Sequence, residues 1–152
     1  MSIKNKYKNI GIIEYYLKYG NIYRNPHEKQ LNIGLPQFIS NNKINTQIKC
    51  EGLDAYTNIA YFNRTGKACI IANIESYNFV KKYDTIICSY ALHLLDFKAL
   101  LKVLTSLKQI SKQLIVITPH DKPTITIDMG WNMVVKNNFK GCKQKYILYH
   151  SI

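Results

Sequence analysis

Apolar residues recur at helical spacing near the start of the chain. Ile10, Ile13 and Leu17 lie three or four positions apart, which places their side chains on one face of an α-helix. Gly20 follows the last of them, and glycine is the residue that most often ends a helix. The pattern therefore predicts a short helix over residues 9–19.

A second helix start follows within a few residues. Residues 25–28, Asn-Pro-His-Glu, supply a capping Asn, a Pro at the first helical position and a Glu at the third. Gly34 and Pro36 interrupt the run that follows, and a proline removes one backbone donor from a helix. We expect this helix to end or kink near Ile33, and the polar, asparagine-rich residues 40–47 to form a loop.

From residue 48 onward, short apolar runs alternate with amphipathic segments. A helix is expected over residues 55–63, directly behind Asp54. The predicted strands cover residues 48–53, 68–72, 85–88 and 114–117. The second and third of these runs are continuously apolar, as in strands that are covered on both faces. Alternation of strands and helices of this length is typical of right-handed βαβ units and a parallel sheet.

The longest amphipathic segment lies between the last two of these strands. Asp96 has the side chain of a helix cap, and the apolar residues after it recur with the period of one helical stripe. The stripe consists of Phe97, Leu100, Leu101, Leu104 and Leu107. This helix leads into the apolar strand at 114–117, which ends before Pro119.

The end of the chain has a different pattern. Residues 131–136 and 144–150 are predicted to be two strands joined by a turn at 137–141, which suits an antiparallel hairpin at the edge of a sheet. The expected fold class is α/β, with a Rossmann-like, mostly parallel sheet, an antiparallel C-terminal edge hairpin and N-terminal helices. The expected domain is single and covers residues 1–152, with a helical segment at 1–42 and an α/β core at 48–150.

Composition indicates a folded chain and leaves its partner open. The chain is 47% hydrophobic and 20% charged, so it lies near ordinary globular proteins rather than disordered ones. Lysine and arginine total 21 against 9 acidic residues, and the net charge of +12 would attract RNA or another anionic partner. An AT-rich genome yields the same excess of Lys, Asn, Ile and Tyr without selection for binding, so both interpretations stay open.

Tyrosines near the start of the chain have two interpretations as well. Together with Arg24 they would form a stacking and phosphate-binding surface for single-stranded RNA, or they would form the partly buried face of the first helix. The residues concerned are Tyr15, Tyr16, Tyr19 and Tyr23.

The cysteines and the apolar runs exclude two classes of protein. The four cysteines have none of the short spacings of a zinc site or a tight disulfide framework, so no metal is predicted. They are Cys50, Cys69, Cys88 and Cys142, and we expect small buried side chains in a reducing compartment. No apolar run reaches the roughly 20 residues that cross a bilayer. We expect a cytoplasmic protein with no membrane partner.

Candidate chemistry lies where the predicted strands end. Ligands of open α/β sheets bind outside the carboxyl ends of the strands. Asp54 follows the first core strand, where a carboxylate can accept hydrogen bonds from both hydroxyls of a ribose. The same side chain could instead cap the next helix, and one residue could do both.

Residues 83–95 carry the most informative motif. An aromatic-Asp pair, Tyr-Asp, opens an apolar strand, and a His-Leu pair ends the loop after it. This segment resembles the fourth strand and following loop of class I S-adenosylmethionine-dependent methyltransferases. Residues 51–56 resemble that family's second strand with its ribose-binding acid, and 114–119 its fifth strand. With the closing hairpin, the resemblance covers residues 48–150.

The resemblance implies S-adenosylmethionine as cofactor and a small molecule or RNA as methyl acceptor. Asp54 would bind the ribose, and Ile74 and Glu75 would flank the adenine. The methionine end would lie against Ser89, Tyr90 and Ala91. Substrate candidates are His93, Pro119 and His120, for which a core histidine and a solvated turn are the structural alternatives. No catalytic residue is assigned, because methyl transfer depends chiefly on the alignment of the reacting atoms.

One expected element of that family is missing. Its first strand ends in a glycine-rich GxGxG-type loop, which should lie before residue 48, yet the interval offers only Ile-Gly-Leu-Pro at 33–36. We therefore expect a sheet without one central strand. Three hypotheses follow: a truncated or degenerate methyltransferase, a non-catalytic module that binds RNA or a partner protein through its basic surface, or a chain whose missing strand comes from another chain.

Overall fold

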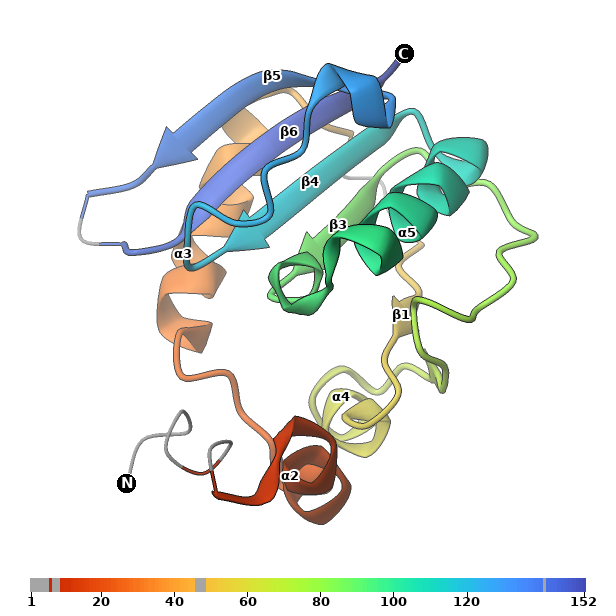
Figure 1. The fold of residues 1–152 in the computed structure, drawn as a ribbon. Helices are drawn as coiled ribbons and strands as arrows, with labels where there is room; N and C mark the ends of the chain where they lie inside the picture. The colour runs from red at the N-terminus through yellow and green to blue at the C-terminus, as the bar shows by residue number, and fades with distance from the viewer. Residues whose placement is uncertain (1–5, 7–8, 46–48, 141) are drawn as a thin grey trace. The chain divides into compact units, whose positions relative to one another are not determined.

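The computed structural model describes residues 6, 9–45, 49–140 and 142–152 (Figure 1). Backbone contacts divide the chain into two compact units. Unit 1 comprises Met1–Glu28 and Gln47–Tyr77, and unit 2 comprises Lys29–Thr46 and Asn78–Ile152. The expectation of a single domain stays a prediction. No helix in the described ranges is long and apolar enough to cross a membrane.

Unit 2 is built on a four-stranded sheet in the order β3-β4-β6-β5. The strands are β3 (Ile86–Ser89), β4 (Gln113–Thr118), β5 (Trp131–Asn138) and β6 (Lys145–Ser151). β3 and β4 are parallel, whereas β6 is antiparallel to both β4 and β5. The predicted strand at 114–117 and the predicted edge hairpin are confirmed.

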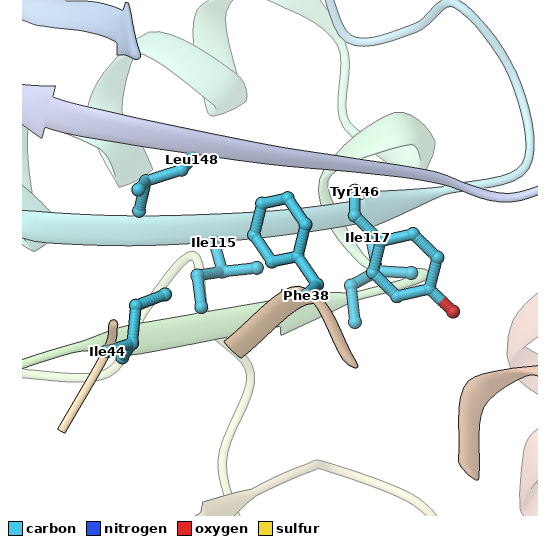
Figure 2. Close-up of a cluster of buried hydrophobic side chains, with 6 residues drawn as sticks. All are labelled: Phe38, Ile44, Ile115, Ile117, Tyr146 and Leu148. Atoms are coloured by element: carbon cyan, nitrogen blue, oxygen red, sulfur yellow. The ribbon is translucent and has the colours of Figure 1, made fainter. Parts of the chain in front are cut away.

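Two helices cover opposite faces of this sheet (Figure 1). They are α3 (Glu28–Asn41) and α5 (Phe97–Ile110). Successive β4 side chains alternate between the faces, and Ile115 and Ile117 pack on the side of Phe38 from α3 (Figure 2). This cluster consists of Phe38, Ile44, Ile115, Ile117, Tyr146 and Leu148. The core of unit 2 therefore lies on both sides of β4.

Helix α3 runs through Pro36 to Asn41, so the predicted end near Ile33 is wrong. The loop predicted over residues 40–47 begins after Asn41, and residues 46 and 47 lie outside the described residues. An interior proline costs about 3 kcal/mol. Burial of Phe38, whose side chain is completely inaccessible, stabilises the helix by about 1.5–3 kcal/mol, and its apolar neighbours on the same helix add to this. Tertiary packing therefore overrides the local break.

Helix α5 begins as predicted. The Asp96 carboxylate accepts a hydrogen bond from the Ala99 amide at 2.8 Å. The buried stripe, however, is shifted around the helix axis, because Phe97 and Leu101 are exposed. Buried positions are Leu100, Val103, Leu104, Leu107 and Ile110.

The elements of unit 1 with described bounds are short helices, a 3₁₀ turn and a pair of two-residue strands. Its elements are α2 (Ile12–Tyr19), η1 (Gly20–Ile22), β1 (Gly52–Leu53), α4 (Asn58–Thr65) and β2 (Cys69–Ile70). The first helix ends before Gly20 as predicted, but it buries Tyr15 and leaves Ile13 and Leu17 exposed. The helix predicted over 55–63 begins three residues later.

Strands β1 and β2 are parallel, as predicted, but shorter than predicted. Residues 49–51 form no strand, residue 48 lies outside the described residues, and Ile71 after β2 is 67% exposed. In unit 2, Ile87 of β3 is exposed as well, so neither apolar run is covered on both faces. An apolar run alone does not give a covered strand, because covering requires neighbours on both sides.

The strands of the described residues form two separate sheets, β1-β2 and the four-stranded sheet. Among these residues β1 pairs with β2 alone, and β3 pairs with β4 alone. The expected loss of one central strand stays a prediction.

Candidate functional site

In unit 1, the predicted adenosine-binding residues share one edge of the β1-β2 sheet. Asp54 follows β1, and the turn containing Ile74 and Glu75 follows β2. The two strands are parallel and in register, and the Asp54 amide donates to the Ile70 carbonyl at 3.0 Å. Their carboxyl ends therefore lie together, where ligands of such sheets bind.

The Asp54 carboxylate is fixed by the turn that follows it. Oδ1 accepts hydrogen bonds from the amides of Tyr56 and Thr57, both at 2.7 Å. The cap of α4 itself is Thr57, so Asp54 orders the turn before the helix. Oδ2 accepts no hydrogen bond from any residue that the structure describes. In this carboxylate, Oδ1 therefore holds the turn together, and Oδ2 can accept a hydrogen bond from another donor.

The turn after β2 is closed by Asn73. Its side-chain oxygen accepts from the Glu75 amide at 3.0 Å, and its carbonyl accepts from the Tyr77 amide at 3.0 Å. These bonds leave Ile74 half-buried and Glu75 exposed. The turn therefore presents one apolar and one acidic side chain at the same sheet edge as Asp54.

Cys69 lies close enough to Asp54 for the two to interact. Burial and then the Asp54 carboxylate raise the pKa of the Cys69 thiol above its ordinary value. The thiol therefore stays protonated at neutral pH, which makes it a poor nucleophile.

In unit 2, the predicted methionine-binding residues follow β3. Tyr90 has a φ of +56°, in the left-handed region that few residues other than glycine adopt. Its amide donates to the Ile117 carbonyl of β4 at 2.9 Å. Ser89 is exposed and Ala91 is half-buried. Strain of this kind costs about 1–3 kcal/mol and is concentrated at functional sites.

Two substrate candidates lie together beyond the ends of β3 and β4. The rings of His93 and His120 have centroids 6.0 Å apart at 73°, and the Tyr90 ring is 6.2 Å from His93. The 3₁₀ turn η2 (Leu92–Leu94) holds His93 half-buried. Its Nδ1 atom is buried and has no hydrogen-bond partner among the described residues. The structural alternative of a satisfied core histidine therefore does not fit this geometry.

Burial gives His93 an unusual titration. Desolvation, and then the neighbouring His120, lower the pKa of His93 below its ordinary value of 6.5. The ring is consequently neutral at pH 7, with a lone pair on one nitrogen. Such a group can accept a proton from a ligand.

His120 belongs to a turn that the sequence did not reveal as ordered. The buried Thr118 hydroxyl donates to the Lys122 carbonyl at 2.6 Å, and Pro119 between them is half-buried. The carboxylate of Asp121 pairs with Lys145 of β6 and lies 3.7 Å from Lys136 of β5. These contacts anchor the turn and present His120 at its exposed side.

A pocket in unit 2 also escaped the sequence analysis. It has a volume of about 450 Å³ and lies between α3 and the turn after β5. Its lining residues are Lys29, Gln30, Ile33, Gly34, Gln37, Phe139, Lys140 and Cys142. The residues come from segments about a hundred positions apart, so no local motif signals it. No group of three or more potential metal ligands occurs in the described ranges.

Comparison with known sequences gives one partial relative. No family model matches the chain. An uncharacterized protein of Schizosaccharomyces pombe is 35% identical over 89 residues, which are 52% of this chain and 36% of the yeast protein. The chain thus matches about a third of that relative's length.

Comparison with solved structures shows the fold. The N-methyltransferase NodS from Bradyrhizobium japonicum, in complex with S-adenosyl-L-homocysteine, matches with a TM-score of 0.62 and 11% identity over 90% of this chain and 97% of that one. The magnesium protoporphyrin IX methyltransferase of Synechocystis, with bound SAM, matches with a TM-score of 0.58 and 11% identity over 99% and 95%. The chain has a class I methyltransferase-like, Rossmann-like α/β fold, as residues 83–95 predicted.

Proposed function

We propose that this chain binds S-adenosylmethionine and transfers its methyl group to a small molecule or RNA. Two proteins of similar fold are methyltransferases with bound S-adenosylmethionine or S-adenosylhomocysteine. The observation that carries the proposal is Asp54. It follows β1, its Oδ1 is held by two amides, and its Oδ2 is left for a ligand donor.

The residues of unit 1 fit the adenosine part of the cofactor. Asp54 Oδ2 can accept a hydrogen bond from a ribose hydroxyl, and charge-assisted bonds of this kind are among the stronger ones. Ile74 offers an apolar surface for the adenine, and Glu75 beside it offers acceptors for an amino group. The rigid turns around them reduce the entropy that binding would cost.

Residues of unit 2 suit two further tasks, which are to bind the methionine part of the cofactor and to take up the proton that the methyl acceptor loses. Ser89, Tyr90 and Ala91 would hold the methionine end, and the strained Tyr90 backbone is the feature expected of such a loop. The cofactor supplies a methyl group on a positively charged sulfur. His93 can accept the proton that the acceptor loses, because its ring is neutral at pH 7, and the exposed His120 ring lies beside it.

The family's glycine loop is absent from the described residues, so the methionine end would lack those backbone contacts. We therefore expect affinity in the micromolar range rather than tighter. An enzyme that relies on alignment can act with such affinity, since orientation supplies much of the rate enhancement.

Isothermal titration of the folded chain with S-adenosylhomocysteine tests the proposal. The matched variant is Asp54→Asn, whose amide oxygen can keep the bonds to Tyr56 and Thr57, while an NH2 donor group replaces the Oδ2 acceptor. We expect at least tenfold weaker binding with an unchanged melting temperature. Asp84→Asn, an exposed acid before β3, is the control. A folded protein without detectable binding would contradict the proposal and favour the non-catalytic module.

A further inference from the structure

The pocket between α3 and the turn after β5 has the chemistry of a nucleotide site. We propose that it holds one nucleotide of a single-stranded RNA, with the phosphate between Lys29 and Lys140 and the base against Phe139. The proposal deepens the proposed function, since it names RNA as the acceptor class and rests on that function for methyl transfer. All lining residues belong to unit 2.

The two lysines approach the pocket from different elements. Lys29 is in the first turn of α3, and Lys140 lies two residues beyond the end of β5. Both side chains are exposed, and neither forms an ion pair with a carboxylate among the described residues. By contrast, Lys136 and Lys145 on the neighbouring strands are associated with Asp121. The pocket therefore has two uncompensated positive charges.

Phe139 supplies an aromatic wall. Its ring forms a T-shaped contact with Tyr146, with centroids 5.2 Å apart at 69°, and it is half-buried in the pocket. This contact holds the Phe139 ring in place. A fixed, partly accessible ring suits base stacking, which tolerates any base because every base has a flat face.

Two amides complete the site. Gln30 Oε1 is buried and has no donor within the residues that the structure describes, and Gln37 lies two turns further along the same helix face. A buried acceptor without a partner is destabilising, and an N–H of a base edge would satisfy it. Gly34 between them lets α3 approach Tyr146 closely, because a side chain there would overlap the Tyr146 hydroxyl.

A small organic anion would contact fewer of the polar and aromatic groups of this pocket than a nucleotide would. One carboxylate needs one ammonium partner, whereas the pocket combines two lysines, an aromatic ring and two amides, which correspond to a phosphate, a base face and a base edge. Its volume of about 450 Å³ suits one nucleotide rather than several. The net charge of +12 favours a polyanion over a small anion as well.

Fluorescence anisotropy with labelled octamers of uridylate and adenylate, added to the full chain without cofactor, tests the proposal. We expect Phe139→Leu to bind about tenfold more weakly and Phe139→Tyr to bind like the unsubstituted chain, because only the latter keeps the ring. In the double variant Lys29→Gln with Lys140→Gln, the logarithm of the affinity should depend less steeply on the logarithm of the salt concentration. The magnitude of this slope should fall by about 0.7 for each phosphate that the lysines no longer neutralise.

The control is Lys98→Gln with Lys102→Gln, which removes the same charge from exposed positions on α5. If this pair weakens binding as much as the pocket pair, the charge acts diffusely and the site is refuted. Failure of both octamers to bind would also refute the site, and binding of 4-hydroxybenzoate in their place would favour a small anion. No cofactor is added in these RNA-binding measurements. Their outcome is therefore independent of whether the chain binds S-adenosylhomocysteine.

Discussion

The two units of this chain contain hydrophobic residues in similar proportion but bury them to different extents. In unit 2, every β4 residue from Leu114 to Thr118 is buried, and helices cover both faces of the sheet (Figure 1). In unit 1, the strands are two residues long, and Tyr15, Gly20 and Ala60 are its buried helical positions. Large apolar side chains of unit 1 stay exposed, including Ile13, Leu17 and Ile71.

The comparison shows what an apolar run requires to become a core. β4 has a strand on each side, whereas β1 has one partner and β3 has one partner among the described residues. Unit 1 relies more on ring contacts, such as the stack of Tyr16 on Tyr56 at 5.9 Å, and on backbone hydrogen bonds. We therefore expect unit 2 to be the more stable part. Three measurements probe how the side chains of the two units are packed.

The largest effect is expected at Trp131. Its side chain is completely inaccessible, and its Nε1 donates to the Leu104 carbonyl at 3.2 Å. Trp131→Ala should lower the free energy of unfolding by about 3–5 kcal/mol, since it leaves a cavity and removes the hydrogen bond to the Leu104 carbonyl. Tyr15→Ala, the matched change in unit 1, should cost less. Urea unfolding followed by circular dichroism measures both, and equal losses would refute the comparison.

An intermediate effect is expected at two glycines that touch aromatic residues. Gly34→Ala brings a methyl group onto the Tyr146 hydroxyl, and Gly20→Ala brings one onto the Tyr56 backbone carbonyl. Each should cost about 1–3 kcal/mol. Tyr146→Phe removes the overlapping hydroxyl, so it should restore part of the loss in Gly34→Ala. Tyr56→Phe should restore nothing in Gly20→Ala, because the obstacle there is backbone.

The smallest effect concerns pH. The pKa of His93 is lowered in the folded state by burial and by His120, so the unfolded chain binds the proton first as the pH falls. This contribution to stability is complete above the ordinary pKa of about 6.5 and is lost as the pH falls below it toward the folded value. Thermal melting of the unsubstituted chain and of His93→Asn between pH 5 and pH 8 would measure it. A variant with the same pH slope would show that other groups cause it.

The sequence predicted best where local pattern and tertiary burial agree. The strand ending at Thr118 combines a strong local signal with burial, and the cap at Asp96 and the turn of the C-terminal hairpin each have a strong local signal. It failed where distant residues decide the outcome. Helix α3 passes Pro36 because Phe38 is buried against β6 residues more than a hundred positions away, and no periodicity within the helix encodes that contact.

The sequence predicted which residues of the candidate site lie at the ends of strands, but not how their side chains are oriented. Because carboxyl ends of parallel strands share an edge, Asp54 and Ile74 could be grouped from sequence, as could Tyr90 and His120. The free Oδ2 of Asp54 and the buried Nδ1 of His93 depend on side-chain orientation, which strand order does not specify. The pocket at Phe139 depends on how α3 lies across the sheet, and this too is a tertiary property.

Trp131 is the single tryptophan of the chain, and it lies in unit 2, whereas the fluorescent side chains of unit 1 are tyrosine and phenylalanine. Emission excited at wavelengths where tyrosine does not absorb thus follows unit 2 alone, and a red shift reports its opening. Ellipticity in the far ultraviolet follows both units. Coincident curves from the two signals would mean one cooperative domain, whereas an ellipticity change that precedes the emission shift would mean that unit 1 melts first.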